Sequence, residues 1–290
     1  MTSNEKAKPD IYCVLCPSFH GATVLSVVLG NHSRVLSMGD TIPLARPGYC
    51  GCGKLRSDCA FWSRLSEAWG PSAGPTLIPA SPVILPWEGL NQAACIGLST
   101  LAARLNFPLE IEPFRRAFDC YLSVCRDMFE FDIFIDGYKS LSRYAALKAA
   151  DYPVRGVIHL TRDPRSFVAS AKRRGRCPTL SAKRWASTHS RITRITNWMR
   201  ERTIIVRHEN LCANPEAELA RVQGWLGVEV EQLLVQPGPD RHWIGNQTVR
   251  HFDGRIRPQR PWQGDLTNEE RSKVETITAR QAIKLGYTFS

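Results

Sequence analysis

A strand-loop-helix unit near the start of the chain constrains the fold more than any other stretch. Residues 11–16 form a short apolar run, residues 17–21 form a turn with Pro, Ser and Gly, and apolar residues then recur at helical spacing. The first amides of a helix have no internal partners and the helix dipole is positive there, so this turn can bind an anion. Many α/β proteins begin with such a unit and bind nothing at it, so other stretches must decide.

Length and composition limit the class of protein. With 290 residues, 43% of them hydrophobic, the chain is long enough for one large α/β domain. We expect a single domain over residues 1–290, with a disordered start at residues 1–9. A Pro-rich connection and a helical acceptor-side segment are expected over residues 70–130. No apolar run reaches about 18 residues and the first ten residues are polar, so we expect a cytoplasmic protein without a membrane span.

The charge points to a polyanionic ligand. Lys and Arg number 38 against 27 Asp and Glu, a formal net charge of +11. This balance suits a nucleotide, a nucleic acid or a membrane surface. The nucleic-acid alternative is disfavoured because no zinc finger, aromatic RNP or helix-turn-helix signature accompanies the basic helices. The opening turn also lacks the Gly-Lys-Ser/Thr ending of an NTP-binding loop, which disfavours an ATPase or GTPase.

Strands and helices alternate along the chain, which predicts a parallel sheet with helices on both faces. Residues 236–261 form a long loop that we expect to be too polar for the core and functional. The helix over 113–129 carries an aromatic stripe that is either core or a wall of an acceptor pocket. The further expected strands are 35–40, 131–136, 155–161 and 203–207, and the further expected helices are 90–104, 180–202, 215–226 and 267–285.

Polar residues follow several of these strands. Asp40 leaves the second strand where open α/β sheets place their chemistry, although it could equally be a turn or capping residue. Asp163 and Pro164 mark a helix start directly after Arg162. Ser170 lies seven residues beyond Asp163, about two helical turns on and nearly on the same face. Arg162 and Ser170 can therefore bind one anionic group together.

The cysteines are expected to be free thiols, because ten of them occur without a secretory signal. Cys50, Cys52 and Cys59 could bind zinc, but the usual pair spacings and a clear fourth ligand are absent. We therefore predict a structural loop here and no metal site.

Several separated stretches carry a family resemblance. They are residues 17–23 (PSFHGAT), residues 157–165 (VIHLTRDPR) with Ser170, residues 205–211 (IVRHENL) and residues 242–252 (HWIGNQTVRHF). In this order the chain resembles bacterial sulfotransferases that use 3′-phosphoadenosine 5′-phosphosulfate (PAPS), which are distantly similar to the tyrosylprotein and carbohydrate sulfotransferases. The resemblance implies a P-loop-like α/β fold with a helical lid or acceptor segment.

The resemblance also implies site residues and a reaction. The donor carries about four negative charges and leaves as 3′-phosphoadenosine 5′-phosphate. The loop from Ser18 through Phe19, His20, Gly21, Ala22 and Thr23 would hold the 5′-phosphosulfate. Arg162 and Ser170 would hold the 3′-phosphate, with Arg250 as a further clamp. Asp40 is the candidate base, and such chemistry requires no metal. The acceptor would be a hydroxyl or amine of a small molecule or glycan, as in natural product modification, and a homo-oligomer is compatible with the sequence.

Two residues depart from the family pattern. The family usually has Lys or Arg two residues before the loop glycine, where this chain has Phe19, and Ala22 replaces a usual Ser or Thr. His20, unless it is a solvent-exposed loop residue, or Lys139, unless it forms a surface salt bridge, could supply the missing positive charge. The altered loop keeps open the alternative of a catalytically inactive nucleotide-binding protein of the same fold. A basic nucleic-acid-binding protein is a further alternative.

Overall fold

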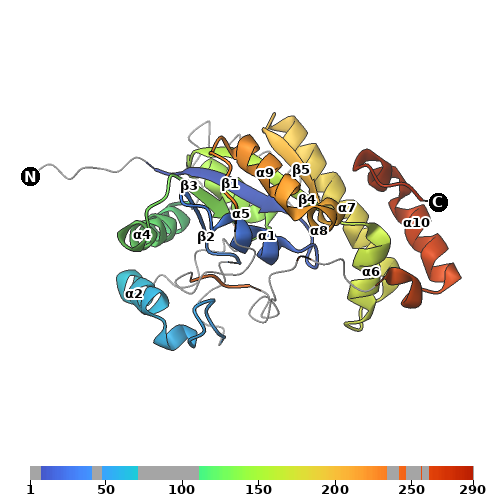
Figure 1. Ribbon diagram of the computed structural model, residues 1–290, viewed down its shortest axis with the longest axis horizontal. Helices are drawn as coiled ribbons and strands as arrows, with labels where there is room; N and C mark the ends of the chain where they lie inside the picture. The colour runs from blue at the N-terminus through green and yellow to red at the C-terminus, as the bar shows by residue number, and fades with distance from the viewer. Residues whose placement is uncertain are drawn as a thin grey trace, which may run out of the picture.

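A five-stranded parallel sheet forms the centre of the protein (Figure 1). The computed structural model describes residues 8–40, 48–70, 111–233, 242–245, 256 and 261–289. The strands lie in the order β2-β3-β1-β4-β5 and pair in parallel throughout. They are β1 (Asp10–Leu15), β2 (Val35–Ser37), β3 (Ile133–Asp136), β4 (Val154–Thr161) and β5 (Thr203–Arg207). The predicted α/β fold with a parallel sheet is confirmed.

Both faces of the sheet are covered by helices, as expected for a parallel sheet. Along β1, Ile11 and Cys13 face a core that includes α2 (Ala60–Trp69), α4 (Glu112–Met128) and α5 (Leu141–Ala149). Tyr12 and Val14 face the other core, which includes α1 (Ala22–Leu29), α8 (His208–Ala213) and α9 (Pro215–Leu226). The aromatic stripe of α4 is part of the first core, since Phe114, Phe118 and Tyr121 are buried together with Leu122 and Cys125.

A third cluster forms where α6 (Pro164–Lys172), α7 (Pro178–Trp198) and α10 (Asn268–Lys284) pack together, with α6 and α10 at the right of Figure 1. The predicted start of α6 is confirmed, because the Asp163 side chain accepts hydrogen bonds from the amides of Arg165 and Ser166. Thr267 begins α10 with a complete capping box. The short 3-10 helices are η1 (Arg56–Asp58) and η4 (Trp262–Gly264).

Several elements differ from the expectations. Helices α2, α5 and α8 were not predicted, and α7 ends at Trp198 rather than at residue 202. The expectation that residues 236–261 are too polar for the core is wrong for Trp243 and Ile244, which are 1% and 3% exposed. The expected helix over 90–104 and most of this long loop, including Arg250, lie outside the described residues.

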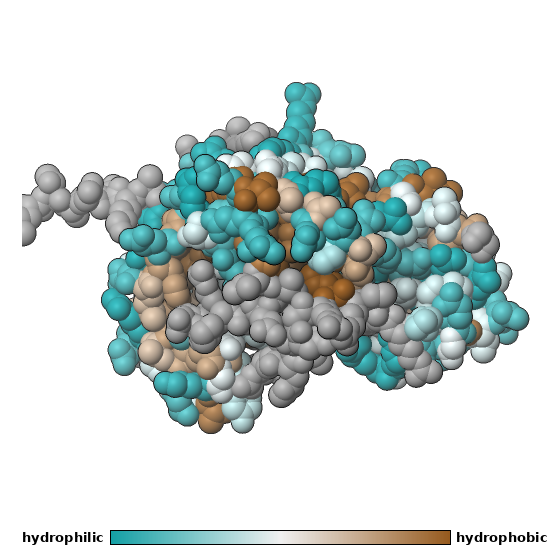
Figure 2. All heavy atoms as spheres, in the orientation of Figure 1, coloured by the Kyte–Doolittle hydropathy of each residue, from teal (hydrophilic) through white to brown (hydrophobic). Residues whose placement is uncertain are grey.

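Figure 2 shows one face of the molecule. Hydrophilic side chains cover most of its described part, and a moderately apolar area lies at the α2 and α4 end. In the part of the chain that the structure describes, no helix has the length and apolar character needed to cross a membrane.

Candidate active site at the carboxyl edge of the sheet

The carboxyl ends of the five parallel strands meet at one edge of the sheet, and the residues singled out in the sequence follow them. The loop from Cys16 to Gly21 leaves β1, Asp40 follows β2, Lys139 follows β3 and Arg162 follows β4. Open α/β sheets bind their ligands at this edge. The strand order puts the β1 loop between Lys139 on one side and Arg162 on the other.

The β1 loop enters α1 through a left-handed glycine. Gly21 has φ 86° and is the N-cap of α1, and a Cβ at this position would lie 2.9 Å from Nδ1 of His208. Ala22 and Thr23 form the first turn of the helix and are buried. Thr23 is covered by Gly245, where a Cβ would lie 2.3 Å from the Thr23 methyl carbon. A residue of the late loop therefore packs directly on the start of α1.

Phe19 and Ser18 form the outer part of this loop and are half-buried. Phe19 has a φ of 68°, which is uncommon for a residue with a side chain. The guanidinium groups of Arg174 and Arg176 lie 4.5 and 5.1 Å from the centre of its ring. Positive charge therefore gathers around Phe19 from the segment after α6, although the residue itself is neutral.

His20 points into the protein rather than to solvent. It is 1% exposed, its Nε2 lies 3.0 Å from Nε2 of His189, and His189 Nδ1 lies 2.8 Å from Nε2 of His159. Its Nδ1 lies 3.1 Å from the carbonyl oxygen of Ser18. Burial lowers the pKa of His20 to about 3, so the ring is neutral near pH 7. The expected alternative of a solvent-exposed loop residue does not match this position.

Asp40 and Lys139 form an ion pair across the ends of β2 and β3. Lys139 Nζ lies 2.6 Å from Oδ1 and 2.7 Å from Oδ2 of Asp40, and both side chains are about one-fifth exposed, at 18% and 19%. Lys139 holds a left-handed backbone with φ 67°. Both charges also act on the buried thiol of Cys16 at the end of β1. The pair therefore stands beside the loop, and Lys139 forms a largely buried ion pair there.

The backbone around Asp40 is held by the late loop. The Ile244 amide donates to the Met38 carbonyl at 2.9 Å, and the Asp40 amide donates to the Ile244 carbonyl at 2.6 Å. Ile244 precedes Gly245, which covers Thr23. The short stretch 242–245 thus joins the Asp40 backbone to the start of α1.

Arg162 lies on the other side of the loop. It is 2% exposed, and its Nη1 donates to the Phe19 carbonyl at 2.7 Å. The indole nitrogen of Trp185 donates to the Arg162 carbonyl at 3.0 Å. Arg162 therefore links the end of β4 to the β1 loop, with its main chain fixed from α7.

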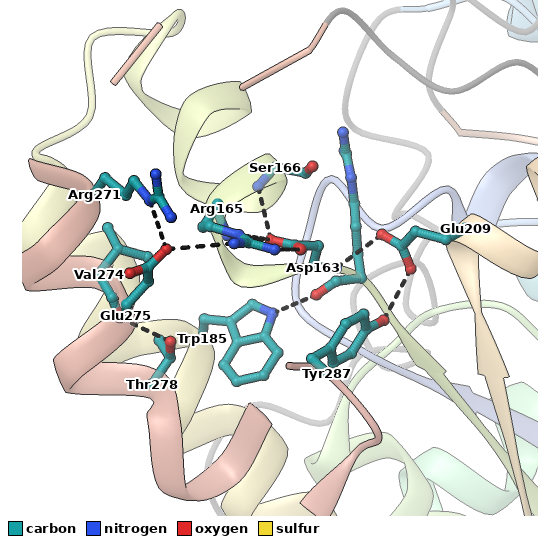
Figure 3. Close-up of polar contacts among 11 residues, drawn as sticks. Asp163, Arg165, Ser166, Trp185, Glu209, Arg271, Val274, Glu275, Thr278 and Tyr287 are labelled. Carbon is teal, nitrogen blue, oxygen red and sulfur yellow. Dashed lines mark hydrogen bonds and ion pairs between the residues drawn. The ribbon is translucent and has the colours of Figure 1, made fainter. Parts of the chain in front are cut away.

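The turn after Arg162 is held by charged and aromatic side chains (Figure 3). The Asp163 amide donates to Glu209 at 2.9 Å, and the other carboxylate oxygen of Glu209 accepts from the Tyr287 hydroxyl at 3.0 Å. Arg165 pairs with Asp163 at 2.8 Å and with Glu275 of α10 at 3.3 Å. These contacts hold the turn in place, and none of them involves the Arg162 guanidinium that contacts Phe19.

Ser170 is fully buried on α6, and its hydroxyl accepts a hydrogen bond from Arg173 at 3.0 Å. Arg173 also pairs with Asp265. Arg162 and Ser170 are thus part of one basic region that includes the arginines after α6. Arg174, Arg176 and Tyr287 were not predicted from the sequence, and Glu209 was noted only as part of the stretch 205–211. Only the run of arginines at 173, 174 and 176 was visible, and its proximity to Phe19 depends on the tertiary structure.

Fold and site together define a P-loop-like α/β protein whose β1 loop lies at the carboxyl edge of a parallel sheet. Residues 113–232 match the model of the "Sulfotransferase family". Over that segment the match bears out the resemblance to sulfotransferases inferred from the sequence, and the likenesses to solved sulfotransferase domains bear out the fold.

Three solved structures are similar along nearly the whole chain. The sulfotransferase domain of the Synechococcus PCC 7002 olefin synthase has a TM-score of 0.59 and 16% identity, covering 100% of this chain and 99% of that one. The sulfotransferase domain from the curacin biosynthetic pathway has a TM-score of 0.53 and 17% identity, covering 99% and 100%. A sulfotransferase from Mycobacterium avium has a TM-score of 0.50 and 16% identity, covering 97% and 78%. At such identities the likeness shows the fold. No curated protein sequence matches the chain.

Proposed function

We propose that the protein is a sulfotransferase that moves a sulfonate group from PAPS to a hydroxyl or amine of a small molecule or glycan. The observation that carries the proposal is the arrangement of charges around the β1 loop. A carboxylate and an ammonium group meet on one side of it, at 2.6 Å, and a buried guanidinium contacts the Phe19 carbonyl on the other.

The donor would lie across the loop with one phosphate at each side. The amides at the start of α1 would hold the 5′-phosphosulfate, because they point outward at the positive end of the helix dipole. Arg162 and Ser170 would hold the 3′-phosphate, supported by Arg173. Arg250 stays a prediction for an additional clamp.

Asp40 would act as the base. In the proposed reaction it accepts the proton of the acceptor hydroxyl or amine, whose oxygen or nitrogen forms a bond to the sulfur. The bond from sulfur to the bridging oxygen breaks, and its electron pair stays on the 5′-phosphate. Lys139 would stabilise the negative charge that develops, since its ammonium group is next to both Asp40 and the loop.

The placement of His20 favours Lys139 as the source of the missing positive charge. A buried imidazole with a pKa of about 3 carries no charge near neutral pH and has both nitrogens engaged within the protein. Arg174 and Arg176 add positive charge around Phe19. These two arginines belong to a segment outside the β1 loop, and they bring positive charge close to the neutral Phe19.

The test is incubation of the purified protein with labelled PAPS and a panel of phenols, sugars, lipids and amine-bearing natural products. We expect a sulfonated product and an equal amount of released 3′-phosphoadenosine 5′-phosphate. Calorimetry with the same bisphosphate measures donor binding separately.

A catalytically inactive nucleotide-binding protein of the same fold is the second candidate, and Phe19 at the usual Lys or Arg position is the observation that favours it. It predicts bisphosphate binding with no turnover of any acceptor. Failure of both binding and turnover would contradict both candidates.

A further inference from the structure

Three cysteines and one histidine meet beside the α2 end of the protein. Cys50, Cys52, Cys59 and His242 each offer one ligand atom, and these four atoms all lie within 4.8 Å of one another. We propose that they bind one structural zinc ion. This departs from the sequence-based expectation of no metal site, because the fourth ligand lies 183 residues beyond Cys59 in the chain.

The spacing of the ligand atoms fits a tetrahedral zinc centre. Zinc lies about 2.3 Å from thiolate sulfur and about 2.0–2.1 Å from imidazole nitrogen, which separates ligand atoms by roughly 3.6–3.8 Å. The sulfurs of Cys52 and Cys59 are 3.7 Å apart. His242 Nδ1 lies 3.7 Å from the Cys50 sulfur and 3.1 Å from the Cys59 sulfur. A zinc ion therefore requires only small side-chain shifts.

The kind of ligand favours zinc in a structural role. Four protein ligands fill a tetrahedral site, whereas a catalytic zinc keeps one position open for water or substrate. Thiolates select soft or borderline metals and exclude calcium and magnesium. Cys50 and Cys59 are both 0% exposed, and Cys52 and His242 are half-buried. Such a site is closed to substrates.

The backbone already holds the ligands in place. The Cys50 amide donates to the Lys54 carbonyl at 2.9 Å, and the Gly53 amide donates to the Cys50 carbonyl at 3.0 Å, which closes a tight loop around Cys52. The ring of His242 stacks on Phe61 of α2, with ring centres 5.8 Å apart and an interplanar angle of 12°. The site is therefore preorganised by contacts that need no metal.

A disulfide explains these residues less well. A bond between Cys52 and Cys59 would use two of the three thiols and leave Cys50, which is fully buried, beside His242 with no covalent role. Zinc uses all four groups. It also accounts for a histidine from a distant segment at this loop.

The proposed ion would hold the stretch that supports Asp40. The Gly51 amide donates to the Trp243 carbonyl at 2.9 Å, and the next residue, Ile244, pairs with Met38 and with the Asp40 amide. Coordination of His242 would thus fix a segment that runs from the cysteine loop to the end of β2. The zinc assignment itself does not depend on the proposed reaction.

Zinc content tests the proposal directly. We expect the full chain, purified without chelators and analysed by inductively coupled plasma mass spectrometry, to contain about one zinc per chain. Cys52→Ser and His242→Ala should weaken zinc retention against a chromophoric chelator at least roughly tenfold. Cys120→Ser is the matched control, since Cys120 is also a half-buried free thiol but belongs to α4 and is not one of the four proposed ligands.

A second measurement does not depend on the variants folding. Cobalt added to the reduced, metal-free wild-type protein should give the intense visible absorption of tetrahedral thiolate coordination, and zinc should abolish it. The proposal is overturned if the wild type contains no zinc and gives no such spectrum. It is also overturned if Cys120→Ser loses zinc as readily as Cys52→Ser, or if peptide mapping finds a Cys52 to Cys59 disulfide in protein that binds no metal. Donor binding, measured separately, distinguishes these results from failure of the proposed function.

Discussion

At the scale of single residues, a substitution of Asp40 is expected to distinguish donor binding from the chemical step. Asp40→Asn keeps the size of the side chain but removes the proton acceptor, so we expect turnover to be abolished while donor affinity stays within about twofold of the wild type. Turnover of labelled PAPS and calorimetry with the bisphosphate measure the two effects. An active Asp40→Asn enzyme would exclude this residue as the base.

Lys139 is expected to be the cation that replaces the usual loop Lys or Arg. Lys139→Met removes the charge and keeps much of the length, and we expect kcat to fall by roughly 10²–10³, the cost of losing one group that stabilises charge in the transition state. Lys139→Arg should recover part of this loss. Equal rates for Lys139→Met and the wild type would instead favour Arg174 or Arg176 as the source of charge.

Arg162 is expected to act on donor affinity more than on the chemical step. A charge-assisted hydrogen bond contributes about 1.5–3 kcal/mol, so Arg162→Ala should weaken bisphosphate binding by at least roughly tenfold. Arg116→Ala is the control, because Arg116 is an exposed arginine on α4. Calorimetry that found the two variants equal would contradict the assignment of Arg162 to the 3′-phosphate.

The site residues differ in how far the sequence could predict them. Asp40, Lys139 and Arg162 could be found because each follows a buried strand, and parallel strands end at one edge. The state of His20 could not be predicted, because its burial depends on His189, which α7 supplies 169 residues later. His242 as a partner of the three cysteines likewise has no local signal.

At the scale of elements, helix-capping residues contribute measurably to the free energy of unfolding. In α10 the Thr267 hydroxyl accepts from the Glu270 amide at 3.2 Å, and the Glu270 carboxylate accepts from the Thr267 amide at 2.9 Å. Thr267→Ala should lower the free energy of unfolding by about 1 kcal/mol in denaturant titrations. Thr267→Ser keeps the cap, so a similar loss in this variant would show that the cap is not the cause.

Elements with strong local signals were predictable and those stabilised by tertiary packing were not. Strand β5 and helix α9 match their predicted bounds, since buried β-branched residues mark the first and Pro215 and Gly227 delimit the second. Helix α2 was missed because its first turn, which contains Phe61 and Trp62, follows the cysteine loop without a capping signal. The burial of these aromatic residues depends on distant segments, since α4 packs against α2 and His242 stacks on Phe61.

At the scale of the whole molecule, buried histidines should make stability depend on pH. Burial lowers the pKa of His159 and of His208 to about 4 and places that of His189 well below its ordinary value. Unfolded histidines have a pKa of about 6.5, so below this pH the unfolded state binds more protons than the folded state. The free energy of unfolding should therefore be highest above about pH 6.5 and fall as the pH drops toward about 4.

Denaturant titrations between about pH 5 and pH 8 check this dependence. A variant with His159→Gln and His189→Gln should show a shallower slope of unfolding free energy against pH, although its absolute stability is lower. The slope is therefore the quantity to compare. An unchanged slope would place the pH dependence elsewhere in the protein.

The strand order has a consequence for how such a protein can diversify. Strands β2 and β3 form one flank of the sheet and come from a single uninterrupted stretch, residues 35–136, whereas β4 and β5 form the opposite flank and come from later sequence. Residues 35–139 therefore carry Asp40 and Lys139 on one continuous segment, which lies in the sequence between the β1 loop and Arg162, the two places where the donor is proposed to bind. Exchange of this segment between relatives would change the surroundings of Asp40 and Lys139 while leaving Arg162 and Ser170 untouched. In the part of the chain that the structure describes, His242 to Gly245 returns to this segment and pairs with the Met38 and Asp40 backbone, so a working chimera would have to carry that short stretch as well.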